Sequence, residues 1–208
     1  MRVAVLGAGS IGTTIGGRLA DAGHDVVYGV RDPGSQRYAE LSERATVVTT
    51  AEALQGADAV LFAVPGAAVS DLLDAQGAAL DGTIVIDATN SMGNSMGGGA
   101  MHSMSLFEER VPGAHVFRAF NTLGWENFAD PVIDGERADL FYAGPATDDC
   151  AAVERLIADV GLRPVYVGEG VAGADVLDGL TRLWFTLALQ QGHGRHIAFR
   201  TLGLGGAA

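Results

Sequence analysis

The sequence predicts an α/β protein built on a doubly wound, mostly parallel sheet, with a small helical lobe at its C-terminal end. Apolar runs of strand length alternate with helical stretches along most of the chain, which is the pattern of strands joined by crossover helices. One run, residues 59–64, is apolar throughout, as expected for a strand that helices cover on both faces. The first run leads directly into a glycine-rich turn. We therefore expect a sheet domain over residues 1–168 and a helical lobe over residues 169–208.

Each expected element is bounded by turn-forming residues or by a change in hydrophobic period. Gly23 marks the end of the first helix, because glycine readily adopts the left-handed conformation that closes a helix. The expected helices cover residues 11–22, 148–160 and 175–199, and the expected strands cover residues 2–6, 25–30, 46–49, 59–64, 83–87, 115–120, 140–143 and 164–167.

A glycine motif joins the first strand to the first helix. Gly7 permits a tight turn, Gly9 lets a pyrophosphate approach the backbone, and Gly12 allows the helix to pack closely on the strand. The helix N-terminus adds unpaired N–H groups and a partial positive charge. This context, strand then motif then helix, predicts a Rossmann dinucleotide site whose contacts are Gly7, Ala8, Gly9, Ser10, Ile11 and Gly12.

The end of the second strand favours NADP over NAD. NAD-selective sites place an acidic residue there to bind the ribose hydroxyls, whereas this chain has Val30 followed by Arg31. A guanidinium suits a 2′-phosphate because it donates two parallel hydrogen bonds. Arg37 is a candidate second phosphate ligand. The alternative is that Arg31 is a solvated arginine at a strand end, neutralised by Asp32, which could instead cap the next helix.

Composition excludes several kinds of chemistry. All 13 basic residues are arginine, so mechanisms that need a lysine are excluded. The net charge of −12 disfavours nucleic acid as a partner. The single cysteine, Cys150, excludes an internal disulfide and is expected to pack in a helix. Without a long apolar stretch or a leader pattern, we expect a cytoplasmic protein with no membrane segment.

Ligands of open α/β sheets lie over the carboxyl ends of the strands, and several such ends carry suggestive residues. Val64 and Pro65 could form an apolar wall for a nicotinamide ring. Asn90, Asn121 and Thr122 offer neutral donors and acceptors that could place a carboxamide or an acceptor ring, although such residues also commonly cap turns. The contacts expected here are Ala63, Val64, Pro65, Ala88, Asn90, Ala119 and Asn121, with Thr122 as a further placing residue.

The remaining polar and aromatic residues receive structural interpretations. Residues 90–104, rich in Gly, Ser and Met, are expected to form a mobile loop, with His102 as a lone surface histidine. His193 and His196 have no acidic or cysteine partner at metal spacing, so no metal site is assigned. Trp125 and Trp184 are expected in the core or at an interface. The apolar face of the last helix predicts a homodimer.

Four segments of the chain resemble the family of NADP oxidoreductases dependent on coenzyme F420: residues 7–12, 29–31, 63–65 and 118–125. The same segments are similar to the cytosolic domain of six-transmembrane metalloreductases. The resemblance extends to residues 179–183. It implies a usually dimeric enzyme that moves hydride between NADPH and a deazaflavin (coenzyme F420) or a flavin such as FMN or FAD. The family's phosphate-binding Ser-Arg pair falls on Val30 and Arg31, so the arginine is kept and the serine is not.

Our leading hypothesis is direct hydride transfer to a small-molecule acceptor with no catalytic acid or base, because placement in a dry cleft supplies most of the catalysis. One alternative is an NADPH-dependent imine or ketone reductase that uses a tyrosine, Asp87 or Asp175 as acid. Another is a non-catalytic NADP-sensing module. A hydroxyacid dehydrogenase is excluded, because that class needs a catalytic lysine and a larger helical domain.

Overall fold

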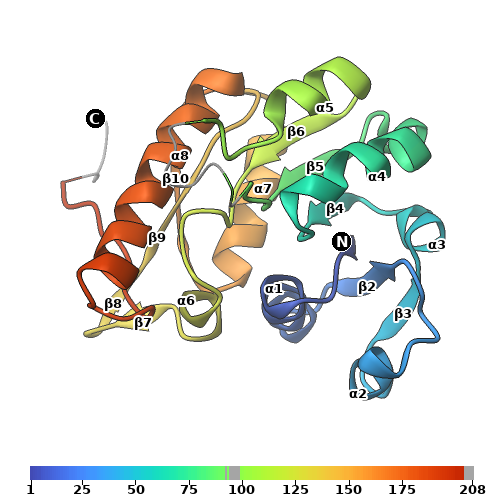
Figure 1. The fold of residues 1–208 in the computed structure, drawn as a ribbon, viewed down its shortest axis with the longest axis horizontal. Helices are drawn as coiled ribbons and strands as arrows, with labels where there is room; N and C mark the ends of the chain where they lie inside the picture. The colour runs from blue at the N-terminus through green and yellow to red at the C-terminus, as the bar shows by residue number, and fades with distance from the viewer. Residues whose placement is uncertain (92, 94–98, 204–208) are drawn as a thin grey trace.

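The computed structural model describes residues 1–91, 93 and 99–203, and its centre is a six-stranded parallel sheet (Figure 1). The strand order, β3-β2-β1-β4-β5-β6, reverses direction between β1 and β4, which confirms the doubly wound topology. Ligands of such sheets bind at that reversal. The strands are β1 (Arg2–Leu6), β2 (Asp25–Val30), β3 (Thr46–Thr49), β4 (Ala59–Phe62), β5 (Ile84–Asp87) and β6 (His115–Arg118).

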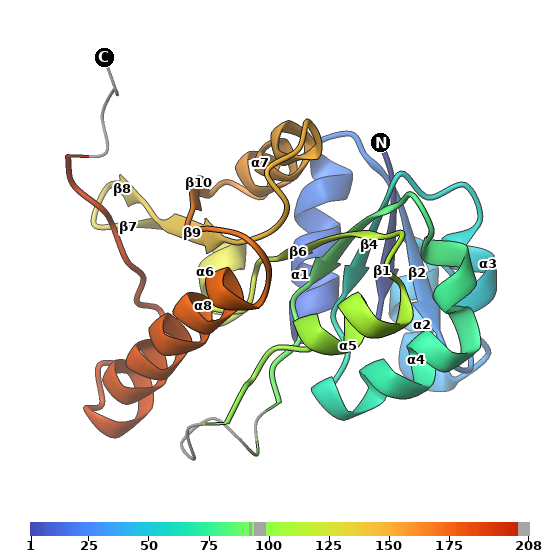
Figure 2. The ribbon, with the colours of Figure 1, turned by 90° about the horizontal axis from the view of Figure 1, so that it is seen from above.

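Helices cover both faces of this sheet, and alternate strand residues point into two separate cores (Figure 2). In β1, Val5 belongs to the core that includes residues of α1 and α7, whereas Leu6 belongs to the core that includes residues of α3, α4 and α5. This arrangement explains why the strands are apolar throughout. The helices are α1 (Ser10–Asp21), α2 (Ala39–Ser42), α3 (Thr50–Leu54), α4 (Val69–Gln76), α5 (Met104–Arg110), α6 (Glu126–Ala129), α7 (Asp149–Asp159) and α8 (Gly170–Phe185), with short 3₁₀ turns at Gln36–Tyr38, Gly66–Ala68 and Gly77–Leu80.

The last two predicted strands do not extend the main sheet as parallel members. They form a separate parallel pair, β9 (Asp139–Tyr142) with β10 (Arg163–Tyr166). A single antiparallel bridge between Arg118 and Ala143 joins this pair to β6. The reason lies in the connection: between β6 and β9 the chain forms α6 and a small hairpin, β7 (Val132–Ile133) and β8 (Glu136–Arg137), instead of a full crossover helix.

The C-terminal lobe is helical only in its first half, so the predicted helix over residues 175–199 is partly wrong. Helix α8 begins at Gly170, continues as a π-helical turn over Thr186–Gln190, and ends before Gly192 and Gly194. These two glycines have φ of 74° and 83°, a left-handed conformation that stops the helix. Residues 191–203 then run back across the lobe in irregular structure.

Asp139, at the start of β9, holds this returning segment. Its carboxylate accepts hydrogen bonds from Arg163 Nε at 2.6 Å and from the Thr201 N–H at 2.6 Å, and its own N–H donates to the Phe199 carbonyl. Burial acts to raise the pKa of Asp139, but the hydrogen bonds from Arg163 and Thr201 prevail and hold that pKa below its usual value. The C-terminal segment is therefore anchored to the sheet rather than loose.

One face of α8 remains uncovered in the single chain. Val176, Leu183 and Leu189 are about half exposed, and Val176 and Leu183 line an apolar groove together with Phe141 of β9 and Val167, which follows β10. The predicted homodimer would bury this face, and it stays a prediction. Within the described ranges, no helix combines the length and the apolar character needed to cross a bilayer.

Candidate functional site

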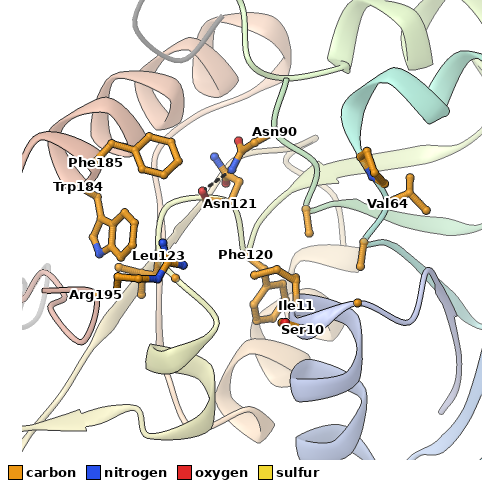
Figure 3. A pocket seen from close by; sticks show the side chains of 15 residues that line it. Ser10, Ile11, Val64, Asn90, Phe120, Asn121, Leu123, Trp184, Phe185 and Arg195 are labelled. Atoms are coloured by element: carbon orange, nitrogen blue, oxygen red, sulfur yellow. Dashed lines mark hydrogen bonds between the residues drawn. The ribbon is translucent and has the colours of Figure 1, made fainter. Parts of the chain in front are cut away.

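A cleft of about 400 Å³ opens at the carboxyl ends of the main-sheet strands, between the N-terminus of α1 and the C-terminal part of α8 (Figure 3). This size lies within the range of small-molecule sites, roughly 300–1,000 Å³. The lining is mostly apolar. It consists of Gly9, Ser10, Ile11, Ala63, Val64, Pro65, Ala88, Asn90, Phe120, Asn121, Leu123, Gly124, Trp184, Phe185 and Arg195.

The glycine turn is built tightly except at one point. Gly7 has φ of 102°, and a Cβ there would lie 2.6 Å from the Ala63 carbonyl oxygen. At Gly12 a Cβ would lie 2.2 Å from the Gly7 oxygen. A Cβ on Gly9, by contrast, would meet no atom within 4 Å. The empty space beside Gly9 is where the backbone can be approached by a ligand, as the sequence motif predicts.

The N-terminus of α1 is open to a ligand. Gly9 is its N-cap residue and provides no side-chain cap, so the first N–H groups of the helix lack the usual side-chain acceptor. Ser10 and Ile11, the first residues of α1, line the cleft. An anion placed there would accept hydrogen bonds from these groups and interact favourably with the helix dipole. The turn therefore fits the diphosphate of a dinucleotide.

At the end of β2, the residues predicted to select NADP lie outside the cleft. Val30 is buried, and the guanidinium of Arg31 is exposed and makes no hydrogen bond or ion pair within the described part of the chain. The described residues show no ion pair between Arg31 and Asp32, and Asp32 Oδ1 accepts the Gly34 N–H at 3.2 Å. The Arg37 guanidinium lies over the Tyr38 ring, 4.8 Å from its centroid. Arg31 is thus available to an exogenous anion.

Two asparagines face each other at the inner end of the cleft (Figure 3). Asn90 Nδ2 donates to the Asn121 carbonyl at 2.9 Å, and Asn121 Nδ2 donates to Thr181 Oγ1 on α8 at 3.2 Å. Asn121 Oδ1 is buried and has no hydrogen-bond partner among the described residues. Phe120, which precedes Asn121 and also lines the cleft, has a positive φ of 61°. Such a backbone conformation costs about 1–3 kcal/mol for a non-glycine residue.

Asn90 is oriented by a buried network of ion pairs around Arg118, which was not predicted from the sequence. Arg118 is fully buried and donates from Nη2 to Asn90 Oδ1 at 2.9 Å. The same guanidinium bonds Asp87 Oδ2 at 2.9 Å and Asp178 Oδ1 at 3.0 Å. Asp178 Oδ2 in turn accepts the Met101 N–H at 2.6 Å. Arg118, on β6, thus connects the end of β5 with α8, and through Asp178 with the end of the glycine-rich loop. Its bond to Asn90 links this network to the cleft.

His102 is not a surface histidine, so that prediction is wrong. Its side chain is only 3% exposed, Nδ1 accepts the Met104 N–H, and Nε2 lies 3.2 Å from Asp175 Oδ1. Because Nδ1 accepts a hydrogen bond, the neutral ring carries its proton on Nε2. His102 is buried because α8, which is remote in sequence and carries Asp175, packs over this part of the loop. Residues 92 and 94–98 of the predicted mobile loop lie outside the described residues.

The cleft gathers most of the predicted contacts and adds others. Ala119 and Thr122 are buried away from it. Trp184 is buried as expected, whereas Trp125 is 39% exposed and outside the core, so its place at an interface stays a prediction. The predicted residues that line the cleft are Gly9, Ser10, Ile11, Ala63, Val64, Pro65, Ala88, Asn90 and Asn121, and those missed are Phe120, Leu123, Gly124, Trp184, Phe185 and Arg195.

Known proteins are similar to this chain in sequence and in fold. Residues 2–91 match the family described as "NADP oxidoreductase coenzyme F420-dependent". The F420-dependent NADP reductase of Methanothermobacter marburgensis is 28% identical over 91% of this chain and 93% of its own. A solved structure from Arthrobacter sp. FB24, named as a candidate F420-dependent NADP reductase, aligns with a TM-score of 0.83 at 25% identity, covering 97% of this chain and 99% of that one.

A more distant structure shares the fold alone. The reductive aminase from Aspergillus terreus, solved in complex with NADPH and ethyl levulinate, aligns with a TM-score of 0.70 at 22% identity. The alignment covers 92% of this chain but only 62% of the aminase, so the present chain spans less than two thirds of that protein. The family match and the two reductases similar over nearly their whole length agree with each other. The chain is thus similar over nearly its whole length to two proteins named as F420-dependent NADP reductases, and residues 2–91 match the model of the coenzyme F420-dependent NADP oxidoreductase family.

Proposed function

We propose that this NADP-dependent oxidoreductase transfers hydride between NADPH and a deazaflavin, coenzyme F420, or a flavin such as FMN or FAD. The observation that carries the proposal is the chemistry of the cleft. Among the described residues that line it, none is an Asp, Glu, His, Cys, Tyr or Lys. Hydride transfer between two rings tolerates this lack, because solvent can supply the remaining proton.

The proposed cofactor site follows the fold from the glycine turn inward. The open face of Gly9 and the first N–H groups of α1 would hold the diphosphate, with Ser10 and Ile11 beside it. Val64 and Pro65 would form an apolar wall against the nicotinamide ring, while Asn121 Oδ1 offers its carboxamide an unused acceptor. When bound, NADPH supplies hydride from C4 of that ring.

The protein's contribution would be placement and exclusion of water. Asn90 is fixed at both ends of its amide, by the Asn121 carbonyl and by Arg118, so it cannot swing freely. Trp184 and Phe185 on α8 close the opposite side of the cleft with apolar surface. Holding two reacting atoms roughly 3–3.5 Å apart in such surroundings accounts for about 7–11 kcal/mol of a barrier in favourable cases.

An imine or ketone reductase is the second candidate, favoured by the shared fold of the aminase. The residues proposed as its acid do not support it. Asp87 is fully buried and ion-paired with Arg118, and Asp175 contacts His102, so neither lines the cleft. No tyrosine is among the described lining residues. A non-catalytic sensor is disfavoured because the family and the similar reductases are enzymes.

Arg31 is proposed to select NADPH through the 2′-phosphate. Replacing Arg31 with alanine is expected to weaken NADPH binding by about 1.5–3 kcal/mol, the scale of a hydrogen bond to a charged group, and to leave NADH binding nearly unchanged. Arg155→Ala is the control, because it removes the same charge from an exposed position on α7 outside the cleft. Titrations of both nucleotides by intrinsic fluorescence measure the effect. Equal losses for NADPH and NADH would remove the argument for phosphate recognition.

Rapid mixing with a panel of acceptors tests the proposed reaction. NADPH and enzyme are mixed with coenzyme F420, FMN, FAD or a cyclic imine, and nicotinamide oxidation is followed at 340 nm. We expect oxidation with the deazaflavin or a flavin and none with the imine. Turnover with the imine alone would establish the second candidate, and tight NADPH binding without turnover on any acceptor would point to a sensor.

A further inference from the structure

Arg195 is the one charged side chain among the described residues that line the cleft. It lies across the opening from Val64, next to Trp184 and Leu123 (Figure 3). It falls within the helix predicted over residues 175–199, but the backbone around it is irregular. It brings a guanidinium to the edge of an otherwise neutral, mostly apolar cleft.

The backbone around Arg195 is held on two sides. Asn127, fully buried on α6, donates from Nδ2 to the Arg195 carbonyl at 2.9 Å. Trp184 Nε1 donates to the Ile197 carbonyl at 2.8 Å. Both donors are buried side chains with fixed positions. The returning C-terminal segment therefore presents Arg195 to the cleft from a fixed point.

The side chain is held along one edge and leaves the other edge unused. Glu126 accepts from Arg195 Nε at 2.5 Å and from Nη2 at 3.3 Å, and the guanidinium lies 5.4 Å from the Trp184 ring centroid. Nη1 makes no hydrogen bond within the described ranges. The side chain is 43% exposed, but its ion pair with Glu126 already restricts it, so less conformational entropy is lost when a ligand binds.

We propose that Arg195 binds an anionic group, a phosphate or carboxylate, on the side chain of the ring-bearing hydride acceptor. Trp184 and Phe185 line the same end of the cleft and would face the ring itself. This inference rests on the proposed function, and it defines the substrate class more closely: a planar redox ring with a negatively charged tail. The diphosphate of the cofactor is assigned to the α1 N-terminus, so Arg195 remains for the acceptor.

A pair of probes that differ in one phosphate separates this role from a merely structural one. FMN and riboflavin share the same ring, and their own fluorescence anisotropy reports binding to protein saturated with NADP⁺, so no turnover is needed. The wild-type protein is expected to bind FMN about tenfold more tightly than riboflavin, as one charged hydrogen bond provides. Arg195→Gln, which keeps the stem over Trp184, is expected to abolish that preference and leave riboflavin affinity unchanged. Arg195→Lys should retain part of it.

The matched control is Arg155→Gln, which removes the same charge from an exposed position on α7 outside the cleft. It is expected to keep the preference for FMN. Three results would overturn the proposal: no binding or no preference in the wild type, equal weakening of both probes in Arg195→Gln, or a loss of NADP⁺ affinity in that variant. Failure of the proposed function would be distinguishable from these results: the wild type would still prefer FMN to riboflavin, but no acceptor in the rapid-mixing panel would oxidise NADPH.

Discussion

Replacing Gly9 with alanine is expected to weaken NADPH binding by about tenfold to hundredfold while leaving the free energy of unfolding unchanged. A Cβ at this position would meet no protein atom within 4 Å, and the backbone there is extended, so the folded chain accommodates it. The same methyl group would occupy the space in which a diphosphate must approach. Overfilling a packed contact costs about 1–3 kcal/mol, which sets the expected range.

Gly17 provides the control for this substitution. It lies on the same helix, α1, and a Cβ there would also meet no atom within 4 Å, but it does not line the cleft. Gly17→Ala should therefore leave NADPH affinity unchanged and stabilise the protein by about 0.5–1 kcal/mol through its helix propensity. Calorimetric titration and urea unfolding measure the two quantities. Unchanged NADPH affinity in Gly9→Ala would contradict the proposed diphosphate site.

Replacing Arg118 with methionine is expected to lower the free energy of unfolding by about 3–5 kcal/mol, the cost of leaving a buried charge without its partner. The substitution would leave the Asp87 and Asp178 carboxylates buried without the cation they share. Asn90 would also lose one of the two bonds that hold its amide. The surviving folded protein should therefore also turn over more slowly.

Arg155→Met is the control for that prediction, because Arg155 is 76% exposed and its ion pair with Asp159 lies at the surface. Its expected effect on stability is within about 0.5 kcal/mol. Urea unfolding followed by circular dichroism measures both variants under the same conditions. A loss below about 1 kcal/mol for Arg118→Met would mean that the network does not hold the lobe to the sheet.

The parts of the site that the sequence predicted are those set by local chain geometry. The turn around Gly9 follows from a strand, a glycine spacing and a helix within a dozen residues, and the positions of Val64 and Asn90 just after β4 and β5 follow from the sheet pattern. Such signals survive folding because neighbouring residues determine them. The strand bounds of β2 and β3 agree with prediction for the same reason.

The parts that the sequence did not predict depend on contacts between distant segments. Arg118 meets Asp178 on α8, 60 residues away, and Asn127 meets the Arg195 carbonyl, 68 residues away. His102 is buried by the same packing of α8 against the loop. Helical periodicity continued past Gln190, but the glycines at 192 and 194 end the helix, and only tertiary contacts decide where the chain then goes.

NADPH binding at the glycine turn of α1 is the premise of the proposed function. Isothermal titration of NADPH, and separately of NADH, into the pure apoprotein measures it directly. We predict a saturable heat of binding, with NADPH bound more tightly than NADH. If neither nucleotide produces a saturable heat and a parallel equilibrium dialysis retains neither, the cofactor site assigned here does not exist.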